Sequence, residues 1–204
     1  DCDFGTANGQ PFFCTFGVGF DAAVSEKFAQ SKKRGPLTYL SNTVKEYVNY
    51  QPDVYTIAAN GEVLTERAFL VAVCNASQYG NNAYIAPKAS MTDGLLDIIV
   101  VHYGNLLTTA FVGLDLMTGL IDKNFLIHTF RAPSATITRA SAGPVHFDGE
   151  PAAMPARIEV DCRKGGIRIV TPALDKPFKP IITPVTAMVN DMKLTLRRIF
   201  ERQQ

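Results

Sequence analysis

Residues 53–74 read DVYTIAANGEVLTERAFLVAVC and contain the clearest structural signal in the chain. Asp53–Ala59 and the run that begins at Glu62 are both rich in strand-forming residues, and Asn60-Gly61 stands between them. Asn-Gly supplies the two residues with positive φ that a tight two-residue turn needs. The stretch therefore predicts an antiparallel β-hairpin whose second arm ends in the apolar run Phe69–Cys74, a buried central strand.

Further short strands are expected on both sides of this hairpin. Many short strands separated by turns are typical of an antiparallel β-sandwich, so the predicted fold is mainly β with helices added. The predicted strands are Gln10–Gly19, followed by a tight turn, and Leu95–Tyr103, Ile127–Arg131, Ala135–Arg139, Pro144–Phe147, Arg157–Asp161 and Ile167–Thr171, with a turn at Lys164-Gly165-Gly166 before the last.

Two helices are expected beside these strands, and the segment 75–87 reads as a loop. The first helix begins at Pro36, which suits a first helical turn, and ends before Pro52. The second covers Leu106–Leu120 and places Leu107, Phe111, Leu114 and Met117 on one face. That face and the segment Phe12–Phe20 are candidates for an apolar channel, although most such residues in a globular domain are simply core.

Composition excludes several classes of protein. Of 204 residues, 47% are hydrophobic and 19% charged, which suits a folded domain with a real core. The net charge of +1 argues against nucleic-acid binding. The longest apolar run, Phe69–Cys74, is too short to span a bilayer, and the spacing of the four cysteines matches no metal or redox motif.

Three stretches place carboxylates beside glycine, which lets a backbone approach a ligand closely. They are Gly17-Val18-Gly19-Phe20-Asp21-Ala22, the segment Ile85–Asp97 with Asp93-Gly94 inside it, and His146-Phe147-Asp148-Gly149-Glu150. The middle turn can direct one carboxylate and neighbouring carbonyl oxygens at one point, the donor set that Mg²⁺ prefers. The last can present a general base or a metal partner. Taken singly, each also fits an ordinary capped, Asp-Gly or solvated acidic turn.

In order and context these stretches resemble motifs of the diacylglycerol and sphingosine kinase family of soluble lipid kinases. The first resembles the family's Gly-x-Gly-Phe-Asp-Ala segment. Asn75–Gly80 followed by Ile85–Ala89 resembles the run before its Asp-Gly turn, and Asp148-Gly149-Glu150 resembles its late Asp-Gly-Glu motif. The resemblance extends from about Asp1 to Thr171. It implies the antiparallel β-sandwich C-terminal domain of a two-domain fold of the NAD-kinase-like and lipid-kinase type.

One motif of that family is missing. The Gly-Gly-Asp-Gly-Thr nucleotide motif occurs nowhere in the chain, and in the family it belongs to an N-terminal α/β domain. We therefore expect residues 1–172 to be the substrate-side domain of a longer lipid kinase, and residues 173–204 to form an extended segment and a terminal helix. We also expect the nucleotide-binding domain to precede Asp1 and the chain alone to be inactive as a kinase.

The resemblance implies ATP-dependent phosphorylation of a lipid hydroxyl, such as that of diacylglycerol or a sphingoid base, with Mg²⁺ as cofactor and ATP bound through the N-terminal domain. It assigns the general base to Glu150, and Asp148 would support Glu150 or face the nucleotide and its metal. A structural Mg²⁺ would be held by the Asp93 side chain and the main-chain oxygens of Ser90 and Leu95. The residues expected on the substrate side of the cleft are Gly19, Asp21 and Asn75.

Two other interpretations remain open. An NAD kinase has a similar overall plan and also phosphorylates a hydroxyl, but the chain shows no strong match to a dinucleotide site. The other is a non-catalytic lipid-binding domain. The sequence leaves open the lipid alcohol and the oligomeric state.

The C-terminal residues predict a basic amphipathic helix. Lys176–Gln204 contains six basic and two acidic residues, a net charge of +4. Such a helix can lie on an anionic membrane surface, as a cytoplasmic enzyme with peripheral contact at the inner membrane face would require. Alternatively, its apolar stripe packs on the body of the protein, on the missing domain or on a second copy of the chain in a homodimer. The stripe consists of Val185, Met188, Val189, Met192, Leu196, Ile199 and Phe200.

Overall fold

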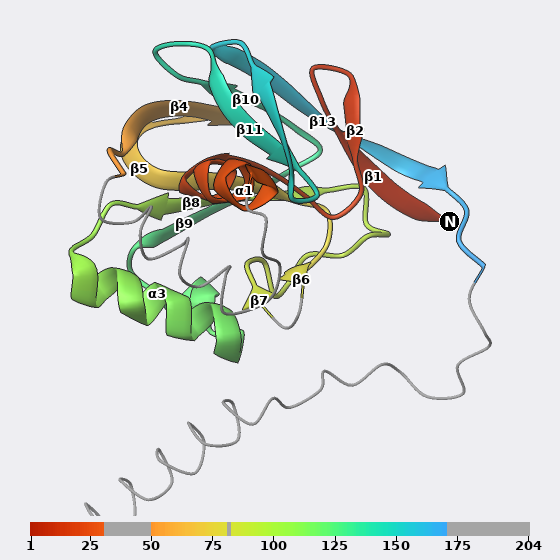
Figure 1. Cartoon of the computed structure of the whole chain (residues 1–204). Coiled ribbons are helices and arrows are strands. Elements are labelled where there is room, and N and C mark those ends of the chain that lie inside the picture. The colour runs from red at the N-terminus through yellow and green to blue at the C-terminus, as the bar shows by residue number, and fades with distance from the viewer. Residues whose placement is uncertain (31–49, 81–82, 171–204) are drawn as a thin grey trace, which may run out of the picture.

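The structure is a computed structural model that describes residues 1–30, 50–80 and 83–170. These residues form one curled antiparallel sheet with helices beside it (Figure 1) and a separate small hairpin. The predicted mainly β, sandwich-like fold is therefore confirmed. The helix predicted from Pro36, and the extended segment and terminal helix predicted for residues 173–204, lie outside the described residues.

In chain order, the described residues form thirteen strands, two α-helices and one 3₁₀ helix. The strands are β1 (Cys2–Ala7), β2 (Gln10–Phe12), β3 (Thr15–Gly19), β4 (Asp53–Ala59), β5 (Glu62–Cys74), β6 (Gln78–Gly80), β7 (Ala83–Tyr84), β8 (Leu96–His102), β9 (Ile127–Ala132), β10 (Ser134–Thr138), β11 (Gly143–Phe147), β12 (Glu150–Met154) and β13 (Arg157–Ile167). The described helices are α1 (Phe20–Gln30), α3 (Leu106–Thr118) and the short 3₁₀ helix η1 (Ile121–Lys123).

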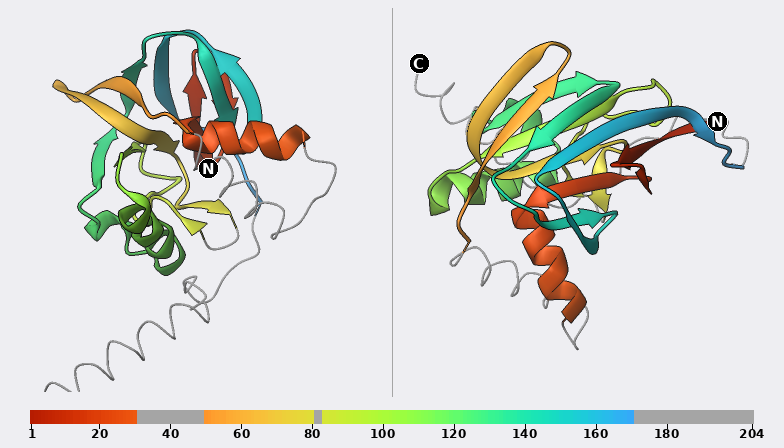
Figure 2. Two further views of the ribbon diagram at one scale, coloured as in Figure 1. Left: turned by 60° about the vertical axis from the view of Figure 1, so that its left-hand side comes forward. Right: turned by 90° about the horizontal axis from the view of Figure 1, so that it is seen from above.

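The predicted hairpin is formed by β4 and β5. Its turn residues Asn60 and Gly61 have φ values of 51° and 81°, as a two-residue turn requires. The first half of β5 pairs with β4, whereas its second half, Leu70–Cys74, pairs with β3 on one side and β8 on the other. Strand β5 therefore connects the two halves of the sheet, whose strand order is β12-β11-β3-β5-β4-β10-β13-β1-β2. Strand β8 pairs with β5 outside this order, and β9 pairs with β8. Figure 2 shows the resulting curl.

Two hydrophobic cores lie on opposite faces of the second half of β5. Val71 and Val73 belong to one core, and Leu70, Ala72 and Cys74 belong to the other. Side chains alternate between the two faces of a strand, so a strand buried on both faces needs apolar residues at every position. This double burial explains the unbroken apolar run at the end of β5.

The helices border the second core and differ in part from their predictions. α1 begins at Phe20, directly after β3, where a tight turn was expected, and it contributes Phe20 and Val24 to the core. α3 was predicted correctly as an element, and Phe111, Leu114 and Met117 of its candidate channel face are exposed rather than packed in the core. Phe111 is 62% exposed and Val112 only 6%. No helix in the described part of the chain has the length and apolar character needed to cross a membrane.

The remaining differences concern strands. The turn predicted at Lys164-Gly165-Gly166 is absent, because β13 continues to Ile167 and pairs with β1 as far as Cys2. The predicted strand Gln10–Gly19 is divided into β2 and β3. The small hairpin of β6 and β7 lies within the segment expected to be a loop. The flanking strand β1 and the hairpin arm β12 were not predicted.

Candidate active site

The turn Asp148-Gly149 joins β11 to β12 and places Glu150 at the first position of β12. Asp148 and Gly149 have φ values of 50° and 88°, and Phe147 pairs with Glu150 across the turn. Two successive residues with positive φ reverse the chain in the tightest way available to a hairpin. The Glu150 side chain is exposed to solvent at the end of this turn.

The Asp148 carboxylate fastens this turn to the connection between β2 and β3. Its Oδ2 accepts the backbone N–H of Phe13 at 2.8 Å, and its Oδ1 accepts those of Cys14 at 2.7 Å and Thr15 at 2.9 Å. The Asp148 N–H donates in return to the carbonyl oxygen of Thr15 at 2.8 Å. Burial, together with the charge of Asp148, raises the pKa of the Cys14 thiol above its ordinary value.

A second set of contacts joins the same turn to α1. Asp21 Oδ2 accepts the Tyr79 hydroxyl at 2.9 Å and lies 3.1 Å from His146 Nε2. The other nitrogen of that ring, Nδ1, accepts the Gly149 N–H at 3.3 Å. The first and third glycine-carboxylate stretches of the sequence are therefore in direct contact. His146 and Tyr79 were not among the predicted site residues.

The glycines before α1 are required by this packing. A Cβ on Gly17 would overlap both Asp21 and His146. Gly19 has a φ of 105°, and a Cβ there would come 2.8 Å from the carbonyl oxygen of Phe69. Gly17 thus admits the Asp21–His146 contact, and Gly19 allows the chain to pass from β3 into α1.

Asn75 lies at the centre of a network that connects the β2–β3 link to β1. Its fully buried side chain donates to the carbonyl oxygens of Asp3 at 2.9 Å and Phe13 at 2.7 Å. Its backbone N–H donates to the Cys14 carbonyl at 2.9 Å. Asn75 thus contacts the same short link that Asp148 binds from the other side.

The buried carboxylate of Asp3 extends this network to the Asp93-Gly94 turn. Asp3 is 1% exposed, and its oxygens accept the Gly94 N–H at 2.6 Å and the Gly165 N–H at 2.7 Å. Its own N–H donates to the Met91 carbonyl at 2.6 Å. Sequence reasoning missed Asp3, and its position in the opening Asp-Cys-Asp-Phe-Gly run gave no signal that the side chain is buried.

The proposed magnesium ligands cluster on the loop before β8. The Asp93 carboxylate forms an ion pair with Arg131 and accepts the Leu95 N–H at 3.0 Å. Arg131 Nε lies 3.7 Å from Asp97, and burial raises the pKa of the Asp97 carboxyl above its ordinary value. The hydroxyl of Ser90 lies 3.2 Å from that of Thr92.

The oxygen donors of this loop are of the type that Mg²⁺ selects. Among the described residues, however, no three His, Cys, Asp or Glu side chains are grouped in a way that could hold a metal ion. A magnesium ion here would therefore depend on Asp93, main-chain oxygens and water, and would compete with Arg131 for the Asp93 carboxylate. The residues present therefore fit a cation that is bound by few protein side chains and that competes with Arg131 for the Asp93 carboxylate.

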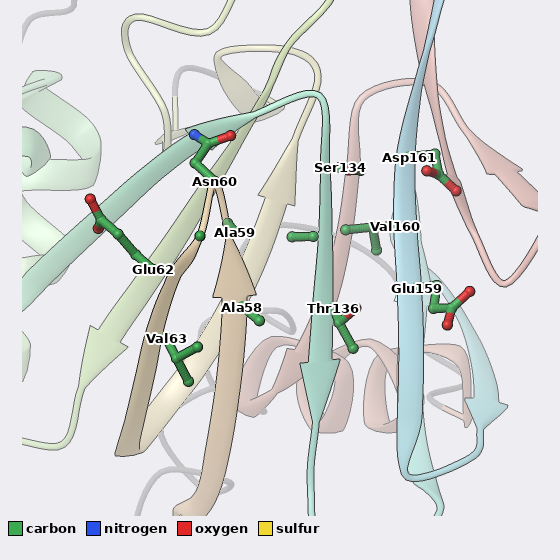
Figure 3. Close-up of a pocket in the computed structure, with 12 residues that line it drawn as sticks. Ala58, Ala59, Asn60, Glu62, Val63, Ser134, Thr136, Glu159, Val160 and Asp161 are labelled. Carbon is green, nitrogen blue, oxygen red and sulfur yellow. The ribbon is translucent and has the colours of Figure 1, made fainter.

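Two hollows of the described surface lie away from Glu150. The larger, an open groove of about 400 Å³, is lined by the β4–β5 turn and neighbouring parts of β10 and β13 (Figure 3). The smaller, about 150 Å³, lies between Ile85, Ile121 and the buried Asp97. Of the predicted site residues, none lines either hollow.

Comparisons with known proteins agree with the fold. Residues 14–171 match the family described as the YegS C-terminal NAD kinase β-sandwich-like domain. A relative from Chromohalobacter salexigens, named "Probable lipid kinase YegS-like", is 26% identical over 152 residues, which are 73% of this chain and 49% of the relative.

Two solved structures from Bacillus anthracis, each named a "putative diacylglycerol kinase", share the fold. One is 27% identical with a TM-score of 0.57, and the other 24% identical with a TM-score of 0.61. In both cases the match covers 80% of this chain and 54% of the other. This chain thus spans about half the length of the relatives it matches. The resemblance to diacylglycerol kinase C-terminal domains is confirmed, and the chain belongs to the YegS C-terminal, NAD-kinase-like β-sandwich domain family.

Proposed function

We propose that this chain is the substrate-side domain of an ATP-dependent lipid kinase in which Glu150 accepts the proton of the attacking lipid hydroxyl. The names of the relatives, a lipid kinase and diacylglycerol kinases, support the reaction class. The observation that carries the proposal is the position of Glu150. Its exposed side chain directly follows a turn that is held by hydrogen bonds on two sides. Asp148 binds the β2–β3 link, and His146 contacts Asp21 on α1.

Phosphoryl transfer needs a positioned hydroxyl and a group that accepts its proton. The contacts of the two carboxylates support Glu150 over Asp148 for that task. Both oxygens of Asp148 already accept backbone N–H groups, so a proton arriving there would remove the charge that strengthens three structural hydrogen bonds. Glu150 follows the turn with its side chain in solvent. Asp148 then supports Glu150 by holding the turn rather than by facing the nucleotide.

The rest of the reaction is assigned by analogy with the family. In this proposal ATP is bound through the nucleotide-binding domain of the two-domain enzyme. A magnesium ion at Asp93, with main-chain oxygens of Ser90 and Leu95, would supply a fixed positive charge that stabilises the loop. Gly19, Asp21 and Asn75 support the wall of the cleft. We place the enzyme in the cytoplasm with peripheral contact at the inner membrane face, where a lipid alcohol is reached, and a homodimer is compatible with this arrangement.

The decisive test is Glu150→Gln in the two-domain enzyme. The amide keeps the shape of the carboxylate but cannot take a proton, so kcat should fall by about 10²–10⁴-fold with little change in ATP binding. Glu66→Gln, an equally conservative change at an exposed position of β5, serves as the matched control. Wild-type turnover by Glu150→Gln would remove Glu150 from this role. The 204-residue chain assayed alone should not consume ATP with any lipid alcohol.

The two other interpretations predict different results in the same assay. An NAD kinase would phosphorylate NAD in place of a lipid alcohol, so NAD is included as a second acceptor. A lipid-binding domain would turn over neither acceptor, even when joined to the upstream half of the protein. Phosphorylation of a lipid alcohol alone supports the proposal.

A further inference from the structure

We infer that His146 is a positioning residue that links Asp21 on α1 to the turn carrying Glu150, an inference that rests on the proposed role of Glu150. His146 lies on β11, two residues before the turn begins, and its ring touches a partner on each side. Asp21 lies at the second position of α1. The imidazole therefore connects α1 with the hairpin of β11 and β12, which lies more than 100 residues later in the sequence.

The two contacts define the protonation of the ring. The Gly149 N–H is a donor, so His146 Nδ1 must accept and cannot carry a proton. In the neutral ring the proton then resides on Nε2, which donates to the Asp21 carboxylate at 3.1 Å. An imidazolium, or the opposite tautomer, would break the Gly149 bond. The structure is thus compatible with one state of the ring, neutral with the proton on Nε2.

The surroundings hold this state in place. The His146 side chain is 2% exposed, so water does not compete for either nitrogen. Tyr79 approaches the same Asp21 oxygen with its hydroxyl and packs its ring edge-on against the imidazole, with the centroids 6.1 Å apart. Gly17 provides the space, because a Cβ there would overlap the Asp21–His146 contact itself.

The consequence for the reaction lies in the orientation of Glu150. Asp148 fastens the turn to the β2–β3 link, which fixes one side of it. The His146 link adds a second attachment through Gly149, the residue directly before Glu150. Because the turn is held at both Asp148 and Gly149, it cannot rotate about either contact alone. Because a misplacement of about 1 Å can cost on the order of 10²-fold in rate, the second attachment affects turnover without touching substrate.

Two substitutions separate the halves of the link. In His146→Gln the amide nitrogen occupies the place of Nε2 and can donate to Asp21, but no acceptor remains for Gly149. In His146→Asn the amide oxygen occupies the place of Nδ1 and can accept the Gly149 N–H, but Asp21 is out of reach. His128→Gln is the matched control, because His128 lies on β9 with its ring against Phe130.

The first readouts use the 204-residue chain. Long-range ¹H–¹⁵N spectra at pH 7.5 should show His146 neutral with its proton on Nε2. Hydrogen exchange at the Gly149 amide should accelerate by about 5- to 10-fold in His146→Gln, as expected for the loss of one hydrogen bond, and stay near wild type in His146→Asn and His128→Gln. A proton on Nδ1, or unchanged Gly149 exchange in His146→Gln, would overturn the inference.

The second readout uses the two-domain enzyme. Both His146 variants should lower kcat by about 10- to 100-fold while the KM for ATP stays within about threefold, and His128→Gln should leave both unchanged. Wild-type kcat in both His146 variants contradicts the positioning role. If the wild-type enzyme phosphorylates no lipid, the proposed function fails by itself, and the spectra and exchange rates still decide whether the link exists.

Discussion

The Asp148 carboxylate accepts the backbone N–H of Cys14 at 2.7 Å, a contact that joins residues 134 positions apart in sequence. Phe13 and Thr15 donate to the same carboxylate, so three consecutive backbone N–H groups converge on one side chain. Hydrogen bonds to an ionised acceptor are stronger than neutral ones. The Asp148-Gly149 turn indicated by the sequence therefore also stabilises the domain, because it joins the β11–β12 hairpin to the link between β2 and β3.

Asp148→Asn should lower the free energy of unfolding by about 1–3 kcal/mol, since the amide offers one acceptor oxygen and no charge. Asparagine tolerates the positive φ of position 148, so backbone strain does not contribute. Urea unfolding of the 204-residue chain measures the change. Asp161→Asn, at an exposed site, should stay within about 0.5 kcal/mol. Equal stability of the two variants would show that the three contacts contribute nothing.

Gly17→Ala should destabilise the chain by about 2–4 kcal/mol, because the new methyl group forces Asp21 and His146 apart in a buried site. Gly113→Ala is the matched control. Gly113 lies inside α3, a Cβ there meets nothing within 4 Å, and alanine favours the helix by up to about 1 kcal/mol. The melting temperature should therefore fall in Gly17→Ala and rise in Gly113→Ala. A Gly17→Ala chain as stable as wild type would mean that the pair separates without cost.

Local signals in the sequence predicted the hairpin β4–β5, the strands β8 to β11 and α3, because turn residues and apolar periodicity specify them directly. The extent of β13 was missed for a different reason. Lys164-Gly165-Gly166 has the composition of a turn, but its backbone is paired with β1, and Asp3 accepts the Gly165 N–H. Such pairing between strands far apart in the sequence is decided by tertiary structure, which a local pattern does not contain.

The candidate site divides in the same way. Glycine and carboxylate motifs indicated Asp21, Asp93, Asp148 and Glu150. The residues that join them were not found, since His146 and Asp3 become informative only when folding buries them beside their partners. A histidine in a β-strand has no local feature that distinguishes a bridging role from a core position.

Asp93→Ala should abolish any dependence of the melting temperature on magnesium. A ligand that binds only the folded state stabilises it by RT ln(1 + [L]/Kd), about 2.7 kcal/mol at 100 times Kd. Wild type should therefore melt at higher temperature as MgCl₂ is raised, and Asp93→Ala should not respond. Sodium chloride at equal ionic strength controls for screening by salt. A wild-type melting temperature independent of magnesium would refute a metal site at this loop.

Arg131→Met should strengthen the magnesium response, because the guanidinium occupies the carboxylate that the ion needs. We expect the melting temperature to begin rising at a magnesium concentration about two- to fivefold lower than in wild type, because an ion pair of this exposure contributes no more than about 1 kcal/mol. Without magnesium, Arg131→Met should have a lower free energy of unfolding than wild type, because the Arg131–Asp93 ion pair is lost. An unchanged onset concentration would show that Arg131 and the ion do not compete.

α3 provides the last prediction, because the apolar face that periodicity indicates is not the face that packs in the second core. Phe111, Leu114 and Met117 form the apolar stripe that periodicity favours, yet they are 62%, 38% and 49% exposed, whereas Val112 is 6% exposed and packs in the second core. Val112→Ala should therefore cost about 1–3 kcal/mol through lost burial and the cavity left behind.

The triple variant Phe111→Gln, Leu114→Gln, Met117→Gln should cost no more than about 1.5 kcal/mol in total, although it removes far more apolar surface than Val112→Ala. Substitutions at exposed positions typically change stability by no more than about 0.5 kcal/mol each. Both chains are compared by urea unfolding, with circular dichroism at 222 nm reporting the helix. If the triple variant costs more than about 1.5 kcal/mol, the exposed stripe of α3 is covered in solution, and the 204-residue chain should then sediment as more than a monomer, losing that association in the triple variant.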